Sequence, residues 1–174
     1  MNAVLEQLVA LPILVPLLAG AAMLLLTEAR RAARIALALA SSLVQLAVAV
    51  VLLYLTSDAA PFIWQDGIGV YQLGGWPAPF GIVLVADRLS AVMLTLQAVL
   101  GLAVLTYSIA RWDRPGQPFH SLLQFLSMGV NGAFLTGDLF SLFVFVEILL
   151  AASYGLALRA LTGTDHVDGR DDRS

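Results

Sequence analysis

The sequence contains no cysteine and no lysine, and only 12% of its residues are charged. The absence of cysteine excludes disulfides, thiolate catalysis and cysteine-bound metals. The nine positive charges are all arginines, and they form no basic surface of the kind that binds nucleic acid. Because soluble domains carry charge on about a quarter of their residues, this low charge content indicates that water is not the main solvent of the chain.

Apolar residues make up 60% of the sequence, and runs of about twenty apolar residues, the length that crosses a bilayer, recur along it. Backbone groups in lipid must pair within their own segment, so we predict an all-α integral membrane protein. Glu6 and no basic residue precede the first run, which therefore predicts a retained helix rather than a secretory signal. The predicted transmembrane helices comprise residues 7–26, 34–55, 88–110, 118–136 and 138–158.

The arginines predict how the chain crosses the membrane. Most of them lie in alternate connections, whereas the other connections carry mainly aspartate. By the positive-inside rule, we expect the N-terminus outside and the C-terminus in the cytoplasm of a bacterial cell membrane. The arginines assigned to the cytoplasmic side are Arg30, Arg31, Arg34, Arg111, Arg114 and Arg159.

The connection between the second and third predicted helices is rich in glycine and proline. Its residues 70–73 and 80–85 carry branched and aromatic side chains on either side of a glycine-proline turn. This pattern predicts a short extracytoplasmic β-hairpin. Asp87 follows the hairpin and is predicted to cap the exposed N–H groups of the third helix.

Residues 161–174 are polar and densely charged, which predicts a disordered tail. His166 lies among aspartates there, but a solvated tail explains it better than a metal site does. We therefore expect neither a metal nor a cofactor.

Glu147 lies near the middle of the fifth predicted helix and is the most informative side chain. A charged residue at this depth costs roughly 2.5 to 3.5 kcal/mol on insertion scales, so it is usually neutralised, paired or turned towards a cavity. Desolvation raises the pKa of a carboxyl group and a nearby cation lowers it. A group under both influences can bind and release protons, which predicts proton translocation through a buried Glu147. The structural alternative is a protonated glutamate that hydrogen-bonds a neighbouring helix.

The fourth predicted helix carries a polar stripe. Its members follow one another at steps of four, three and four residues, which keeps them on one face of a helix. Such a stripe is poorly suited to lipid, so it should face the bundle interior as a polar pathway or as hydrogen-bonding contacts between helices. The stripe consists of His120, Gln124, Ser127 and Asn131.

Counting residues inward from the helix ends places Ser127 near the depth of Glu147, with Gln97 and Gln45 at a similar level. A polar belt at mid-membrane is therefore a hypothesis. Tyr154, two turns after Glu147, either continues the belt or is a buried tyrosine with a satisfied hydroxyl. His120 at the cytoplasmic boundary either shuttles protons or has no such role.

Two long stretches resemble a known family. The run NGAFLTGDLFSLFVFVEILLAASYG at 131–155 and the run WPAPFGIVLVADRLSAVML at 76–94 are similar to the N-terminal part of the D subunit of Mrp-type multisubunit monovalent cation/proton antiporters. That family is related to the antiporter-like subunits of respiratory complex I. The resemblance implies a transporter subunit rather than an enzyme, with other antiporter subunits as partners and sodium or potassium exchanged for protons. It also implies a proton-transfer role for Glu147.

The chain departs from the family in three respects. Family members are considerably longer, and they pair the glutamate with a lysine on a later helix, which has no counterpart here. Ser141 replaces a common asparagine. Since paired inverted repeats enclose the ion path in such transporters, we expect either a truncated chain or a short relative that needs partners. A membrane subunit of a redox-driven proton pump and a structural or assembly element remain alternative functions.

Overall fold

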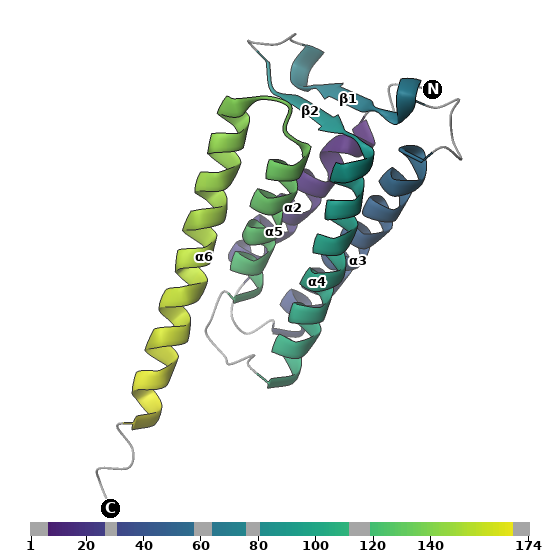
Figure 1. Cartoon of the computed structure of the whole chain (residues 1–174). Helices are drawn as coiled ribbons and strands as arrows, with labels where there is room; N and C mark the ends of the chain where they lie inside the picture. The colour runs from purple at the N-terminus through teal and green to yellow at the C-terminus, as the bar shows by residue number, and fades with distance from the viewer. Residues whose placement is uncertain (1–6, 27–30, 58–63, 76–80, 112–118, 169–174) are drawn as a thin grey trace, which may run out of the picture.

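The computed structural model describes residues 7–26, 31–57, 64–75, 81–111 and 119–168. Its helices run up and down in one bundle, and a small sheet covers one end (Figure 1). A 3-10 turn, Leu8–Ala10, leads into the first helix. The main elements are α2 (Leu11–Leu25), α3 (Arg31–Leu55), β1 (Gly69–Gln72), β2 (Val83–Ala86), α4 (Arg88–Arg111), α5 (Phe119–Leu135) and α6 (Leu139–Asp168).

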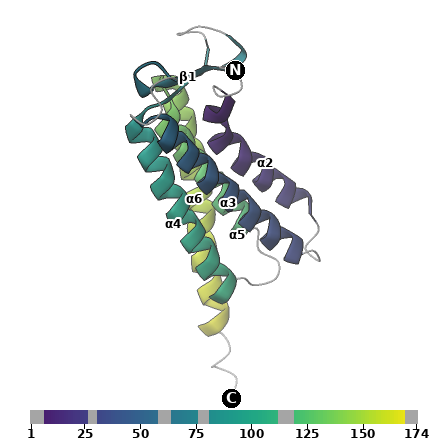
Figure 2. The same ribbon diagram turned by 90° about the vertical axis from the view of Figure 1, so that its right-hand side faces the viewer.

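This architecture confirms the predicted all-α membrane fold. Four segments are long and apolar enough to cross a bilayer, namely 8–25, 31–55, 88–110 and 139–158. The remaining helix, α5, has 17 residues and is the most enclosed, since ten of them are buried. It packs against α2, α3, α4 and α6, and a view from the side shows α2 and α6 on different sides of the bundle (Figure 2).

The sheet lies in the connection where the sequence predicts a hairpin. Its two strands pair antiparallel, with Val70 opposite Val85. The same sheet is held against the connection between α5 and α6, because the Gly137 N–H donates to the carbonyl of Val83 at 2.8 Å and Leu84 forms a bridge with Thr136. The hairpin therefore fixes the end of the bundle at which α4 and α6 begin. Residues 76–80, which hold the prolines of the predicted turn, lie outside the described part.

Aspartates cap the two helices that start beneath the sheet. The Ser90 N–H donates to Asp87 Oδ1 at 2.7 Å, which confirms the predicted cap, and the Ser141 N–H donates to Asp138 Oδ1 at 2.7 Å. Hydrogen bonds from the Ser90 side chain and backbone lower the pKa of Asp87. The backbone hydrogen bond from Ser141 is the main cause of the lowered pKa of Asp138. Both caps therefore stay ionised and favour the helix N-termini at neutral pH.

Glycines allow α5 and α6 to approach closely. A Cβ atom at Gly132 would overlap the Phe145 ring, and one at Gly129 would lie 2.9 Å from the backbone nitrogen of Leu149. Small residues permit such close approach of membrane helices. The two contacts fix both the register of the helix pair and the face of α6 that is turned towards α5.

Replacing Gly129 with alanine is expected to destabilise the chain by about 1–3 kcal/mol, because the backbone of α6 must move to accept the new methyl group. Thermal unfolding of the purified chain in detergent, followed by circular dichroism, measures the loss. Gly155→Ala is the matched control in the same helix pair, since its Cβ would meet only the flexible Leu122 methyls at 3.3 Å. Equal melting temperatures for the two variants would contradict this account of the packing.

Helix α6 is longer than the sequence predicts. It continues to Asp168, whereas the composition predicts a helix that ends at 158 and a disordered tail over residues 161–174. The low hydrophobicity of residues 161–174 argues against their burial, but it does not argue against a helical backbone. A helix that is already nucleated gains one backbone hydrogen bond for each residue added, so the backbone of residues 159–168 can continue α6 despite its polar composition. Residues 169–174 lie outside the described part.

Candidate functional site

A network of neutral side chains joins α3 to α5 inside the bundle. Gln45 Nε2 donates to Gln124 Oε1 at 3.1 Å, and the Ser41 hydroxyl donates to the same oxygen at 3.0 Å. Gln124 Nε2 in turn donates to the carbonyl of Ala38 at 3.3 Å. These groups are nearly inaccessible, with Gln124 only 2% exposed. Because no bulk water reaches such a site, the amides and hydroxyl satisfy one another.

Asn131 extends this network to α2 through a proline. Pro16 lies inside α2 and has no N–H, so the helix leaves the carbonyl of Pro12 without its usual donor. Asn131 Nδ2 donates to that carbonyl at 2.8 Å and to Gln45 Oε1 at 3.2 Å. The side chain thus supplies the hydrogen bond that the proline removes. Its own Oδ1 is buried and has no partner among the described residues.

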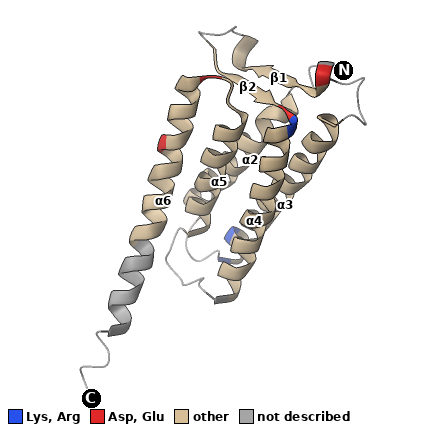
Figure 3. Cartoon of the chain, in the orientation of Figure 1, with Lys and Arg blue, Asp and Glu red and all other residues tan. Residues whose placement is uncertain are grey.

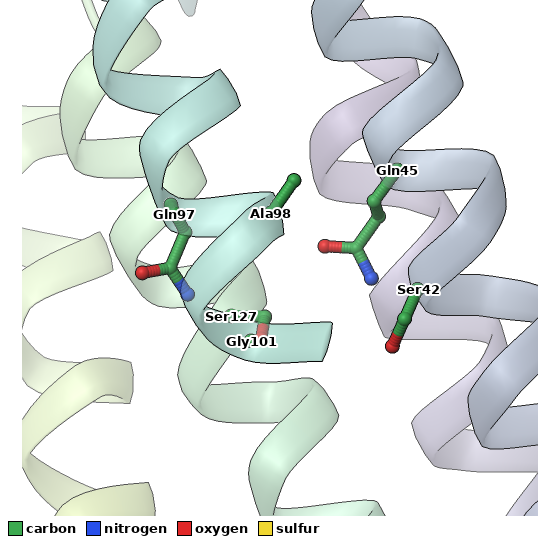
Figure 4. Close-up of a pocket in the computed structure, with 6 residues that line it drawn as sticks. All are labelled: Ser42, Gln45, Gln97, Ala98, Gly101 and Ser127. Atoms are coloured by element: carbon green, nitrogen blue, oxygen red, sulfur yellow. The ribbon is translucent and has the colours of Figure 1, made fainter. Parts of the chain in front are cut away.

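A small polar cavity lies beside the network, between α3, α4 and α5 (Figure 4). It is lined by Ser42, Gln45, Gln97, Ala98, Gly101 and Ser127. The structure therefore brings together Gln45, Gln97 and Ser127, which the sequence analysis places at a common depth. Glu147 is not among the residues that line this cavity.

Glu147 lies on the outward side of α6, where its side chain is exposed. The prediction of a glutamate buried within this chain is therefore wrong. The reason is geometric, because Phe145 and Leu149 contact the glycines of α5 and Glu147 lies about 200° of helical rotation from each of them. In Figure 3 the acidic position within α6 is flanked along the helix by uncharged residues.

The depth of Glu147 follows from the same contacts. Gly132 lies opposite Phe145 and Gly129 lies opposite Leu149, so Glu147 is level with positions 130 and 131. Ser127 is about one helical turn from that level, which is within the uncertainty of counting from helix ends. The carboxylate therefore shares a depth with the polar network but lies on the other side of α5 and α6.

Tyr154 and His120, the two remaining predicted site residues, lie in different surroundings. Tyr154 is 65% exposed on the same outward face as Glu147, so the described helices do not bury it as the second of its two alternatives requires. His120 is 4% exposed, and the Phe119 ring lies edge-on to its imidazole at 5.6 Å between centroids. His120 is therefore enclosed at the start of α5 and does not face an open boundary.

Three residues of the polar network and its cavity were not predicted from the sequence, namely Ser41, Ser42 and Pro16. Ser41 precedes Gln45 by four residues in an otherwise apolar run, which places both on one helical face. Pro16 inside an apolar span predicts a free carbonyl four residues earlier. Both signals are local, but the sequence does not tell which distant side chain forms a hydrogen bond with the Ser41 hydroxyl or the free carbonyl.

Among the described residues, the buried polar side chains include no aspartate, glutamate, lysine or arginine, and the described helices contain one carboxylate at mid-depth. No group of three or more metal-binding side chains occurs among the described residues. The network of amides and hydroxyls can hold helices and bind neutral polar ligands. Within the part of the chain that the structure describes, the titratable side chain at mid-depth is Glu147.

Curated proteins of known name resemble the chain over most of its length. The D subunit of a probable K⁺/H⁺ antiporter of Rhizobium meliloti is 53% identical over 154 residues, which are 88% of this chain and 28% of the relative. The D subunit of the Na⁺/H⁺ antiporter of Alkalihalophilus pseudofirmus is 40% identical over 92% of this chain and 31% of its own length. That of Bacillus subtilis is 39% identical over 87% and 29%. The chain thus spans less than a third of these relatives.

Two solved structures share the fold. The Mrp complex from Dietzia sp. contains a chain that matches with a TM-score of 0.70 and 33% identity, over 86% of this chain and 27% of the other. A membrane-bound sulfane sulfur reductase, an archaeal respiratory membrane complex, matches with a TM-score of 0.72 and 27% identity, over 85% and 29%. No protein-family model matches the chain.

Proposed function

Because the chain is a homologue of the D subunits of Mrp-type antiporters, we propose that it forms part of the transport subunit of a multisubunit monovalent cation/proton antiporter. The reaction is an exchange of protons for sodium or potassium across a bacterial inner membrane, without covalent chemistry. Other antiporter subunits are the partners. Orientation follows the arginine distribution, with the hairpin end of the bundle outside.

The observation that carries the proposal is the position of Glu147. It is the single acidic residue within the apolar part of α6, and its exposed neighbours on that face include Phe143, Val144 and Leu150. A charge that faced lipid there would cost roughly 2.5 to 3.5 kcal/mol. The cost falls when a further polypeptide covers the face and solvates the carboxylate. We therefore assign the proton-carrying role to Glu147 at a contact between α6 and the rest of the complex.

A chimera tests the function. Residues 7–158 of this chain replace the aligned segment of a related D subunit, which is then expressed with its partner subunits in antiporter-deficient cells. Salt-dependent proton flux in everted vesicles is expected to approach that of the unmodified complex, whereas the chain alone should give none. An assembled chimera without flux would contradict the proposal and favour a structural or assembly role. Full flux from the isolated chain would contradict the need for partners.

A membrane subunit of a redox-driven proton pump is the second candidate, supported by the likeness to the archaeal respiratory complex. The same vesicles discriminate the two functions. Antiport predicts flux that starts on addition of Na⁺ or K⁺ to vesicles with a pH gradient and no electron donor. A redox pump predicts flux that requires an electron donor and does not depend on the added cation.

A further inference from the structure

Some of the polar groups that line the cavity between α3, α4 and α5 are not used in hydrogen bonds between the described residues. Both amide hydrogens of Gln45 are used, since Nε2 donates to Ser41 and Gln124, and its oxygen accepts from Asn131. The Ser127 hydroxyl donates to the carbonyl of Leu123 at 3.0 Å and keeps free lone pairs. The cavity therefore has acceptor capacity left over on the α5 side.

Ser42 and Gln97 face this cavity from α3 and α4 and have no hydrogen bond with any residue that the structure describes. Ser42 is 7% exposed. In Figure 4 the Gln97 amide and the Ser42 hydroxyl lie on opposite sides of the space. Ser42 is buried and Gln97 is half-buried. Polar groups in the interior of a membrane domain require partners, and these two side chains do not hydrogen-bond each other.

The space between them has the size of a water molecule. The region open to the centre of a water is about 10 Å³, close to the minimum that one water needs. Gly101 borders this space, and a Cβ atom there would lie 4.0 Å from both Gln97 Nε2 and Ser127 Oγ, so the lining atoms leave room at this position. One molecule placed here has access to the two to four polar partners that a buried water requires.

We propose that this cavity is a binding site for one ordered water that bridges Gln97 of α4 to Ser42 of α3 and Ser127 of α5. A neutral ligand fits the lining better than an alkali cation, since the lining contains no carboxylate and an uncompensated charge is costly to bury. The water also has a structural consequence. The hydroxyls of Thr95 and Thr106 donate to carbonyls of α4 itself, so the bridging water adds a link between α4 and the neighbouring helices.

Paired substitutions test the site in the full chain purified in detergent. Gln97→Leu and Ser42→Ala are each expected to lower the melting temperature by about 2–4 °C. Because both side chains contact the same water, the double variant should lose clearly less than the sum of the two shifts. The control pairs Gln97→Leu with Thr106→Val, an exposed change on the same helix, and should be additive.

Two further measurements identify the ligand. A high-resolution structure is expected to show a density peak within hydrogen-bond distance of the Gln97 amide, absent in Gln97→Leu. The melting temperature should be the same in sodium, potassium and choline chloride. Additive shifts for Gln97→Leu and Ser42→Ala, or no peak in the cavity, would overturn the proposal. So would stabilisation by one alkali cation that Gln97→Leu removes, which would identify a cation site instead.

Discussion

Replacing Glu147 with glutamine in the chimeric complex is expected to reduce salt-dependent proton flux to the level of vesicles without antiporter. Glutamine keeps the shape and hydrogen-bonding capacity of the side chain but cannot bind or release a proton at physiological pH. The effect is large because the described helices contain no second titratable side chain at that depth. Everted vesicles with a fluorescent pH indicator measure the flux.

Assembly should survive the change, because an uncharged amide is less costly than a carboxylate on an outward face of α6. Co-purification of the partner subunits checks this. Glu147→Asp should retain part of the flux, and Tyr154→Phe, on the same face, should retain nearly all of it. Unchanged flux in an assembled Glu147→Gln complex would reject the proton-carrying role, and loss of flux in Tyr154→Phe would place the tyrosine in the path.

Replacing Asn131 with leucine is expected to destabilise the chain by about 1–3 kcal/mol, since it leaves the carbonyl of Pro12 without a hydrogen-bond donor in the bundle interior. The cost should be clearly smaller when Pro16 is alanine, because the new N–H at position 16 can donate to that carbonyl within α2. Thermal unfolding of the two single variants and the double variant measures this coupling.

Pro12→Ala is the matched control. It also replaces a proline of α2, but it leaves the carbonyl at position 12 without a donor as long as Pro16 is present. Its effect should therefore add to that of Asn131→Leu. If Pro16→Ala and Pro12→Ala behave alike towards Asn131→Leu, Asn131 does not compensate for the proline, and its contact with Gln45 must carry the stability instead.

Local patterns predicted much of the fold because their causes are local. The length of the apolar runs predicted the membrane-spanning helices. The position of Asp87 predicted a helix cap, and Asp87 accepts a hydrogen bond from the Ser90 N–H. The polar stripe of α5 predicted an inward face, and His120, Gln124, Ser127 and Asn131 are all buried. The structure continues α6 beyond the predicted end at 158, because composition indicates burial and not how far a helical backbone propagates.

The surroundings of Glu147 were not predictable by the same means. Periodicity relates residues to others on their own helix, so it tells that Glu147 and Tyr154 share a face, but it does not tell which face meets a neighbour. That choice depends on where another helix can approach most closely. Gly129 and Gly132 of α5 provide the closest approach, and they contact the face of α6 opposite to Glu147.

The sequence by itself determined that the chain lies in a membrane, how many helices it forms, and that one carboxylate occupies the middle of the last of them. These properties follow from hydropathy, length and chain order, which are one-dimensional. The tertiary structure alone decided that the amides gather around Pro12 and a polar cavity while Glu147 is turned outward. Such choices depend on close packing between segments far apart in the chain, and close packing is a property of three-dimensional shape.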